Sequence, residues 1–428
     1  MKKPKFQSLT GIHDVLPEEQ KYFQKIYKTV ESIADFYGFE KIDTPLLEET
    51  ELFSRGVGID TDIVEKEMYT FRTKGGDLVS LRPEGTAPVV RSYNEHGMYT
   101  LPQPVKLWYF GPFFRYERPQ AGRFRQFHQF GFEILGEKSP VIDGQIILLS
   151  YNILKELHFK NLMIEVNSIG DSECRPYFKK ILVSYFRSRK HSLCPDCRRR
   201  LKENPLRILD CKEEKCQRIK AGAPQIIDHL CEECHNHFKQ VLEYLDDLEI
   251  PYALNPYLVR GLDYYTKTVF EIFEDTKEGK EQGALLGGGR YDNLVKLLGG
   301  KDVPACGMAA GIERIGNLMR VMNLPSLKPV QPQVFLAQLG VLAKRKSLKL
   351  FEDFRKARIR TAESFSKDSL KTQLRTADKL GIRHVLILGQ KEALEDIITL
   401  RDMKTGAQKI LKLKNIVKEI KQYIKEVE

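Results

Sequence analysis

The sequence lacks any apolar run near the ~20 residues that a membrane-spanning helix requires, so we expect no membrane insertion. Residues 1–6 carry lysines but no apolar stretch of the kind found in export signals, which predicts a cytoplasmic protein. What the chain does have is 42% hydrophobic and 30% charged residues over 428 positions. That composition is typical of a soluble globular protein of two or three domains.

The glycine-rich segment 283–292 lacks the Gly-Lys-Ser/Thr ending of a Walker loop, which excludes that kind of phosphate site. We expect instead a glycine-lined strand that lies against a ligand and turns at Arg290.

Most of the chain also lacks net charge, since the first 329 residues hold 47 basic and 46 acidic side chains. Residues 330–428 hold 22 basic and 12 acidic side chains, and therefore carry nearly all of the net +11. This distribution favours contact between the last quarter of the chain and a polyanion. A lysine-rich surface that only faces water is the alternative.

Cysteine is nearly absent outside one segment, because seven of the eight cysteines lie between positions 174 and 234. Without an export signal, two Cys-x-x-Cys pairs favour a metal site over disulfides. The predicted ligands of a tetrahedral Zn²⁺ ion are the four cysteines of these pairs, Cys194, Cys197, Cys231 and Cys234. Cys211 and Cys216 could replace one pair, and free buried thiols or redox chemistry remain alternatives.

Two aromatic-rich strands are predicted at 107–117 and 124–134, joined by a turn at 118–123 that contains Pro and Gly. Alternate side chains of a strand point to opposite faces. On the second strand one face therefore holds five residues: Arg125, Phe127, Gln129, Gly131 and Glu133. The other face is mostly apolar and is expected to be core. The hairpin thus predicts a polar binding floor, in which Gly131 leaves room for a ligand.

Two helices are predicted in the first hundred residues. Apolar residues recur at helical spacing over 17–37, and Gly38 ends the run before a strand at 39–45. A second helix begins near Glu84 and Thr86. These side chains either cap the helix or hold an amine, for which a buried carboxylate beside a pocket is a suitable partner.

Two further segments place arginine next to groups that suit a ligand. Arg260 precedes the phenols of Tyr264 and Tyr265 at the entry to a strand. A guanidinium can bind a carboxylate or a phosphate, and phenols can hydrogen-bond a polar ring. Arg314 follows the small residues of 305–311 into a helix, whose N-terminus favours an anion.

The end of the chain has a different pattern. Three prolines between positions 324 and 332 indicate a linker, placed at 327–333. Strands then alternate with helices, which predicts a small α/β domain over 334–428.

Together these segments resemble the class II aminoacyl-tRNA synthetases, and the histidyl-tRNA synthetases in particular. The region at about 18–48 resembles motif 1, the hairpin at about 107–135 motif 2, and the region at about 304–318 motif 3. The Arg-Gly-Leu-Asp-Tyr-Tyr segment 260–265 is similar to one that only the histidyl enzymes carry. The resemblance covers nearly the whole chain, and the motifs follow the family's order.

The resemblance implies an α+β fold, with an antiparallel-sheet class II catalytic domain at 1–326 and a C-terminal α/β anticodon-binding domain at 334–428. It also implies an inserted module, here cysteine-rich at about 172–240. A cytoplasmic homodimer would use L-histidine, ATP with Mg²⁺, and tRNA(His). The implied reaction forms histidyl-adenylate and pyrophosphate, and then transfers histidine to the 3′ end of the tRNA.

Roles of individual residues follow from the matching positions. Arg115 would bind the α-phosphate and Arg314 the γ-phosphate, with Glu117 near the adenine. Arg260 would span the histidine carboxylate and the α-phosphate, so that these three arginines are the catalytic ones. The residues implied for the α-ammonium are Glu84, Thr86 and Gln129, and those for the imidazole are Glu133, Tyr265 and the nearby Tyr264.

Two rival functions deserve comparison. A regulatory relative would bind histidine or a partner enzyme without charging tRNA, but such proteins typically lose the 260–265 segment or the C-terminal domain. A pure RNA-binding module would explain the basic last quarter but not the polar face of the hairpin.

Overall fold

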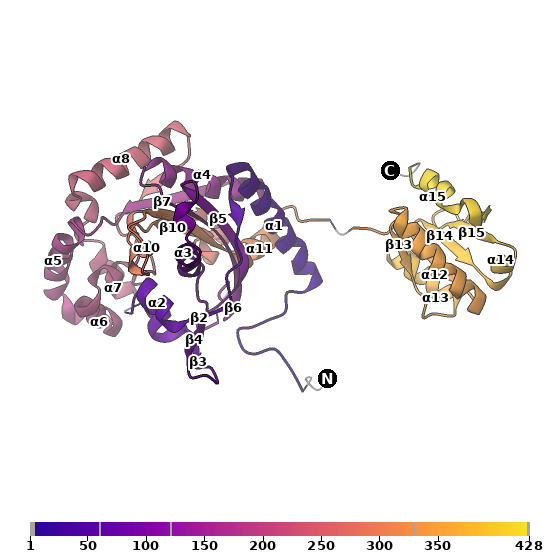
Figure 1. Ribbon diagram of the computed structural model, residues 1–428, viewed down its shortest axis with the longest axis horizontal. Coiled ribbons are helices and arrows are strands. Elements are labelled where there is room, and N and C mark those ends of the chain that lie inside the picture. Colours follow the sequence, from indigo (N-terminus) through magenta and orange to yellow (C-terminus); the bar gives the residue numbers. More distant parts are fainter. Residues whose placement is uncertain (1–4, 60, 120–121, 329, 426–428) are drawn as a thin grey trace. The chain divides into compact units, whose positions relative to one another are not determined.

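The computed structural model describes residues 5–59, 61–119, 122–328 and 330–425. It divides into two compact units, Met1–Leu327 and Lys328–Glu428 (Figure 1). Parts of the predicted segments lie outside the described residues: the N-terminal residues 1–4, turn residues 120–121, linker residue 329 and the last residues 426–428. Among the described residues, no helix is long and apolar enough to cross a membrane.

Unit 1 is built on an eight-stranded sheet. Its strands lie in the spatial order β1 (Glu40–Lys41), β5 (Val105–Phe114), β6 (Gln126–Leu135), β11 (Ala305–Gly311), β10 (Leu286–Arg290), β9 (Thr266–Glu274), β7 (Leu162–Ser168) and β8 (Tyr252–Leu254). All neighbours are antiparallel except β1–β5 and β7–β8 at the two edges. The predicted antiparallel sheet is confirmed, although the first predicted strand is shorter than 39–45.

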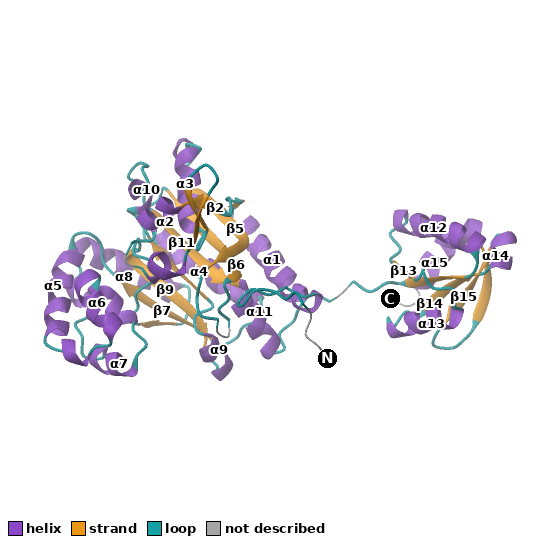
Figure 2. Ribbon diagram, turned by 90° about the horizontal axis from the view of Figure 1, so that it is seen from below, coloured by secondary structure: helices purple, strands orange, loops and turns teal. Residues whose placement is uncertain are grey.

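Helices cover one face of this sheet and form the main hydrophobic core with it (Figure 2). They are α1 (Pro17–Tyr37), α4 (Val141–Glu156), α8 (Glu232–Asp247) and α11 (Ile312–Val321). The predicted end of α1 is confirmed, because Gly38 has a left-handed backbone with φ of 72°. Phe130 and Phe132 of β6 are fully buried in this core, as the alternation of the strand predicts.

The other face carries smaller elements that surround the candidate site. They are α2 (Thr50–Gly56), α3 (Thr86–Glu95), α10 (Leu294–Leu297), and a three-stranded sheet of β2 (Leu47–Glu49), β4 (Leu78–Leu81) and β3 (Tyr69–Arg72). The short helix α9 (Lys277–Gln282) packs against β9 and α11. Several tyrosines pack with α3 and α10 in a second cluster on this face, including Tyr264, Tyr265 and Tyr291.

Between β7 and α8 the chain forms an inserted module of α5 (Cys174–Arg187), α6 (Pro195–Glu203) and α7 (Glu214–Lys220). These helices gather at one end of unit 1, at the left of Figure 1. The module has its own core, which joins Phe178, Leu182 and Phe186 to four buried cysteines. In contrast, α8 contributes side chains to the main core. The separately packed part therefore ends before α8.

Unit 2 is a five-stranded sheet with helices on both faces. The strand order is β13 (Thr361–Glu363), β12 (Val334–Gln338), β14 (His384–Leu388), β15 (Ile397–Asp402) and β16 (Gln408–Lys412). The helices are α12 (Val341–Lys356), α13 (Leu370–Lys379), α14 (Gln390–Leu394) and α15 (Ile416–Lys425). The helix α13 packs on one face, and the other helices share a second core on the opposite face. The predicted α/β domain is confirmed.

Candidate active site

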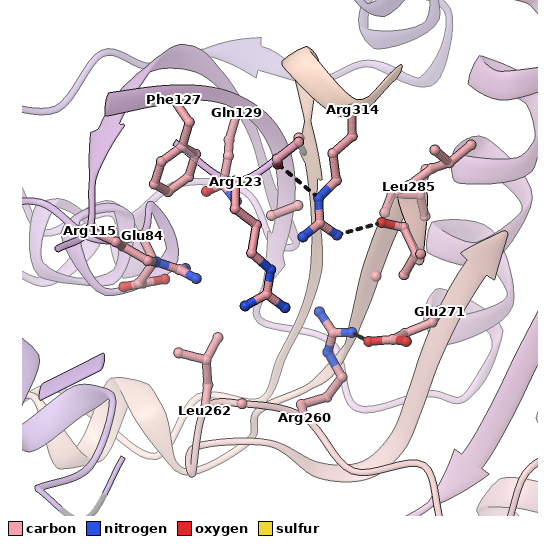
Figure 3. A pocket seen from close by; sticks show the side chains of 18 of the residues that line it. Glu84, Arg115, Arg123, Phe127, Gln129, Arg260, Leu262, Glu271, Leu285 and Arg314 are labelled. Atoms are coloured by element: carbon pink, nitrogen blue, oxygen red, sulfur yellow. Dashed lines mark hydrogen bonds and ion pairs between the residues drawn. The ribbon is translucent and has the colours of Figure 1, made fainter. Parts of the chain in front are cut away.

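A cavity of about 680 Å³ lies over the sheet of unit 1. The β5–β6 hairpin, the segment before α3, residues 259–265, strands β9 and β10, and the start of α11 all contribute to its wall. Four guanidinium groups point into this space, those of Arg115, Arg123, Arg260 and Arg314 (Figure 3). Such a concentration of cations inside one cavity is suited to a ligand with several negative charges.

Arg115 and Arg123 flank Glu117 at the hairpin end of the cavity. Arg115 Nη1 lies 3.8 Å from one carboxylate oxygen of Glu117, and Arg123 Nη1 lies 3.1 Å from the other. Arg115 Nε donates to the carbonyl of Pro83 at 2.9 Å, and its guanidinium lies 5.4 Å from the centre of the Phe127 ring. Both contacts hold Arg115 in a fixed orientation beside Glu84.

Arg260 enters the cavity from the opposite side. Its Nη1 pairs with Glu271 of β9, and its Nε is buried without a hydrogen-bond partner among the described residues. Gly287 of β10 makes this position possible, because a Cβ there would lie 2.5 Å from Arg260 Nη1. The predicted glycine-lined strand therefore lies directly against Arg260.

Arg314 lies in the first turn of α11. Its Nη1 donates to the carbonyl of Ala284 at 3.0 Å, and its Nε donates to the carbonyl of Gly122 at 3.3 Å. Burial lowers the pKa of Arg314, and the neighbouring Arg123 and Arg115 lower it further. An anion bound between these arginines would relieve their mutual repulsion.

Glu84 caps the N-terminus of α3, so the predicted capping role is confirmed. Its carboxylate accepts from the backbone N–H groups of Thr86 and Ala87, both at 2.8 Å. Tyr264 also donates to it, at 3.4 Å. Burial raises the pKa of Glu84, while the two backbone N–H groups lower it. Because Glu84 and Thr86 also line the cavity, capping does not exclude contact with an amine.

Gln129 and Tyr109 offer unused polar atoms at the cavity wall. Gln129 Oε1 and the Tyr109 hydroxyl are buried without partners among the described residues. Tyr109 lies opposite Gly131 in the β5–β6 register, and its ring fills the space that a Gly131 side chain would need. The room beside Gly131 is therefore occupied by Tyr109 and not left for a ligand, which corrects that prediction. Tyr109 itself lines the cavity.

Glu133 does not line the cavity, although it lies on the predicted face of β6. Its carboxylate is fully buried and accepts from the Thr86 hydroxyl at 2.7 Å and from the Tyr291 hydroxyl. Burial raises the pKa of Glu133 to about 8. The predicted contact between Glu133 and an imidazole stays a prediction. Glu133 orients the hydroxyl of Thr86, which does reach the cavity.

Tyr264 and Tyr265 lie side by side on the cavity wall, with ring centres 4.7 Å apart. Burial raises the pKa of Tyr265 to about 12 and that of Tyr264 well above its ordinary value. Both phenols are therefore neutral donors near pH 7.

Several cavity residues had no role in the sequence-based prediction, among them Arg123, Asp210, Lys212 and Glu271. Glu271 of β9 lies opposite Gly287 of β10 in the antiparallel register. A charged residue in the strand next to the glycine-rich one was the sequence signal that could have identified Glu271. Asp210 and Lys212 come from the inserted module, and no local pattern connects them with the hairpin.

The predicted zinc ligands are divided between two places, so that set of four is wrong. The first group, here called the distal cluster, consists of Cys194, Cys197, Cys211 and Cys216. The second, here called the root cluster, consists of Asp171, Cys174, Cys231 and Cys234. In each group the donor atoms lie within 4.8 Å of one another. The alternative in which Cys211 and Cys216 replace one pair describes the distal cluster.

Comparison with known families agrees with this geometry. The sequence model of the family described as histidyl-tRNA synthetase matches residues 11–170 and 200–315. The model described as anticodon binding domain matches residues 333–423.

Full-length relatives match as well. A histidine–tRNA ligase of Dehalococcoides mccartyi is 47% identical, and one of Caldicellulosiruptor saccharolyticus is 45% identical; each match covers 98% of this chain and 100% of the relative. The crystal structure of apo S. aureus histidyl-tRNA synthetase matches with a TM-score of 0.80 and 35% identity, over 98% of this chain and 100% of that one. Sequence, fold and cavity agree from end to end, and this chain belongs to the histidyl-tRNA synthetases of the class II aminoacyl-tRNA synthetases.

Proposed function

We propose that this chain is a histidine–tRNA ligase, which activates L-histidine with ATP and then transfers it to the 3′ end of tRNA(His). One observation carries the proposal: a single cavity is lined by four guanidinium groups and also by the unpaired acceptor of Gln129 and the phenols of Tyr109, Tyr264 and Tyr265. The arginines suit a triphosphate, and the acceptors and phenols suit an amino acid with a polar ring.

In the ATP half of the cavity, Arg115 binds the α-phosphate and Arg314 the γ-phosphate, with Glu117 near the adenine. Arg123 lies between Arg115 and Arg314, and its guanidinium also faces the phosphates of ATP. Mg²⁺ would accompany ATP and neutralise its phosphate charge, and Glu271 on the cavity wall would offer that ion an oxygen ligand.

In the histidine half, Glu84, Thr86 and Gln129 hold the α-ammonium. The free acceptor of Gln129 and the carboxylate of Glu84 support this role, since an ammonium has three donors to satisfy. Tyr264 and Tyr265 hydrogen-bond the imidazole. A pocket that pairs with a polar ring rejects amino acids that leave its own buried groups unpaired.

The first step joins two anions, so it requires charge neutralisation. A histidine carboxylate oxygen attacks the α-phosphorus, the new O–P bond forms, and the bond to the bridging oxygen breaks as pyrophosphate leaves. Arg260 spans the carboxylate and the α-phosphate, and its place on the cavity wall supports this role. The protein supplies position and fixed positive charge and forms no covalent bond to the substrate.

The second step requires tRNA, for which unit 2 supplies a domain of the anticodon-binding type. We place the ligase in the cytoplasm as a homodimer, in which the α1 region that resembles motif 1 forms the subunit interface. Analytical ultracentrifugation tests the dimer directly, and a monomer at micromolar concentration contradicts it.

The distal cluster suits a structural zinc ion. Cys194 Sγ and Cys211 Sγ lie 3.9 Å apart, close to the edge of about 3.8 Å that Zn–S bonds of about 2.3 Å give in a tetrahedron. Cys211 stands between the cavity residues Asp210 and Lys212, so this ion would hold the loop that brings them to the active site. Zinc analysis of Cys216→Ser against the unchanged chain tests the assignment, and an equal zinc content contradicts it.

Histidine-dependent exchange of pyrophosphate into ATP tests the ligase function itself. We expect exchange with L-histidine and none with histidinol, which lacks the attacking carboxylate. A regulatory relative would bind histidine but show no exchange. A pure RNA-binding module would neither bind histidine nor show exchange.

A further inference from the structure

The two chain connections between the inserted module and the catalytic sheet come together where the four side chains of the root cluster meet. Asp171 and Cys174 follow β7, and Cys231 and Cys234 lie at the start of α8. The outgoing and the returning chain each contribute two donors that are three positions apart. This is the spacing from which many zinc sites take a pair of ligands.

The local distances fit a tetrahedral ion. Cys174 Sγ lies 3.5 Å from Asp171 Oδ1. Bonds of about 2.3 Å to sulfur and about 2.0–2.2 Å to oxygen place these two atoms about 3.5 Å apart in a tetrahedron. The backbone N–H of Asp171 also points at Cys174 Sγ, at 3.4 Å, as suits a sulfur that carries negative charge.

Gly170 shows that the backbone makes room for this sulfur. Its φ of 62° is left-handed, and a Cβ built there would lie 2.6 Å from Cys174 Sγ. A side chain at this position would both strain the backbone and push the thiol away from the other three donors. Cys174 and Cys234 are buried while Asp171 and Cys231 are half-buried, so the cluster is enclosed on one side and open to an incoming ion on the other.

We propose that Asp171, Cys174, Cys231 and Cys234 bind a second zinc ion, separate from the one in the distal cluster. Three sulfur donors select zinc over magnesium or calcium, and four protein ligands make the site structural. The match to the family model stops at residue 170 and resumes at 200, so Asp171 and Cys174 lie outside it. The site goes beyond the proposed ligase function and does not depend on it.

This ion clamps the module where it touches the histidine half of the cavity. Arg175, next to Cys174, donates through Nε to the carbonyl of Ile169 at 3.0 Å and through Nη2 to the carbonyl of Tyr265. Lys267 Nζ lies 2.7 Å from Glu233, which stands between the two cysteines of α8. Both halves of the root cluster are thus tied to the backbone that carries Tyr265.

Zinc content measured by mass spectrometry on full-length, reduced protein tests the proposal. We expect about two zinc ions per chain in the unchanged protein and in the control Cys306→Ala, whose buried cysteine belongs to neither cluster. Cys174→Ser and Cys234→Ser should each bind one, and so should the distal variant Cys216→Ser. The double variant Cys216→Ser/Cys234→Ser should bind none.

The outcomes separate the two sites. Root variants that keep the full zinc content overturn the proposal, and so does a single zinc that only Cys216→Ser removes. A single zinc that only root variants remove upholds the root site and rejects the distal one. If the cysteine variants do not fold, Asp171→Asn decides, because losing this half-buried ligand should speed zinc release to a colorimetric chelator about tenfold or more. Unchanged release overturns the proposal.

Discussion

The two units of this chain carry their positive charge in opposite ways. Unit 1 has almost no net charge, yet it holds a set of arginines inside: the Arg290 side chain is 0% exposed, and those of Arg260 and Arg115 are 18% and 20% exposed. The region 330–428 carries ten more basic than acidic residues, and its lysines lie outside, with Lys356 67% and Lys391 80% exposed.

This difference shows that net charge alone does not locate phosphate chemistry. An arginine held by fixed acceptors in a cavity needs no rearrangement when a phosphate arrives, and little water or salt screens it. Exposed lysines act together as a diffuse field that salt weakens. Unit 1 is thus suited to chemistry on one phosphate, and unit 2 to contact with a long polyanion.

The largest expected effect is that of Arg260→Ala. It removes the charge that would neutralise the two reacting anions, so histidine-dependent exchange should fall by about 10²–10³-fold, or ~3–4 kcal/mol. Arg115→Ala should cause a loss of similar size. Steady-state exchange kinetics measure both.

The matched control is Arg345→Ala in α12, which removes an arginine from unit 2 and should leave exchange unchanged. Thermal unfolding checks that the unit 1 variants still fold. Near-normal exchange in Arg260→Ala would remove Arg260 from the proposed mechanism. It would also contradict the idea that the enclosed arginines of unit 1 matter more for the reaction than the exposed charges of unit 2.

Removing unit 2 should have the next largest effect, and on a different step. A chain that ends at Lys328 should keep histidine-dependent exchange, while its charging of tRNA should fall by about tenfold or more. Each lost phosphate contact also reduces the dependence of binding on salt, by a log–log slope of roughly 0.7–0.9. Filter binding across salt concentrations measures the slope.

Gel filtration of the shortened chain comes first, because loss of a dimer would confuse the result. If the shortened chain has the same oligomeric state and binds tRNA with unchanged affinity and salt slope, the basic surface of unit 2 only faces water.

Two buried carboxylates of unit 1 lead to a smaller effect that depends on pH. Burial raises the pKa of Glu133 to about 8, from an unfolded value of about 4.5. The folded chain then binds the extra proton between these values, so this group lowers the free energy of unfolding as pH rises from 4.5 to 8. Glu133→Gln, which does not titrate, should gain stability relative to the unchanged chain between pH 5 and pH 8.

Asp143 gives the opposite sign. Burial would raise its pKa, but the ion pair with Arg290 outweighs burial and holds the value at about 2. Its contribution is present above pH 3.8 and is lost as pH falls toward 2. Melting temperatures measured at pH 5 and pH 8 test the Glu133 prediction. The gain of Glu133→Gln over the unchanged chain should be larger at pH 8 than at pH 5, and an equal gain at both pH values would contradict the raised pKa.

The smallest effect should come from a single exposed lysine of unit 2. Lys391→Ala should change the free energy of unfolding by no more than about 0.5 kcal/mol, because its pairing with Glu395 is a surface one. Its effect on tRNA binding should be at most about one unit of salt slope. A loss as large as that of Arg260→Ala would mean that unit 2 also holds preorganised charge.

Local pattern determined much of this protein. The helix over 17–37, the hairpin faces, the strand and helix around Arg314 and the α/β order of unit 2 could all be predicted, because each depends on spacing within one segment. The cavity arginines Arg115, Arg260 and Arg314 could be identified from the sequence, because each lies within a short motif that is recognised from adjacent residues.

Only the tertiary structure decided which distant groups meet. It paired Cys194 and Cys197 with Cys211 and Cys216 and left Cys231 and Cys234 at the module's root, because the module closes its own core before the chain returns. It also filled the space beside Gly131 with Tyr109, placed Glu133 beneath the cavity, and brought Asp210 and Lys212 to its wall. Strand alternation fixes the face on which a side chain lies, but packing between segments far apart in sequence fixes what it touches.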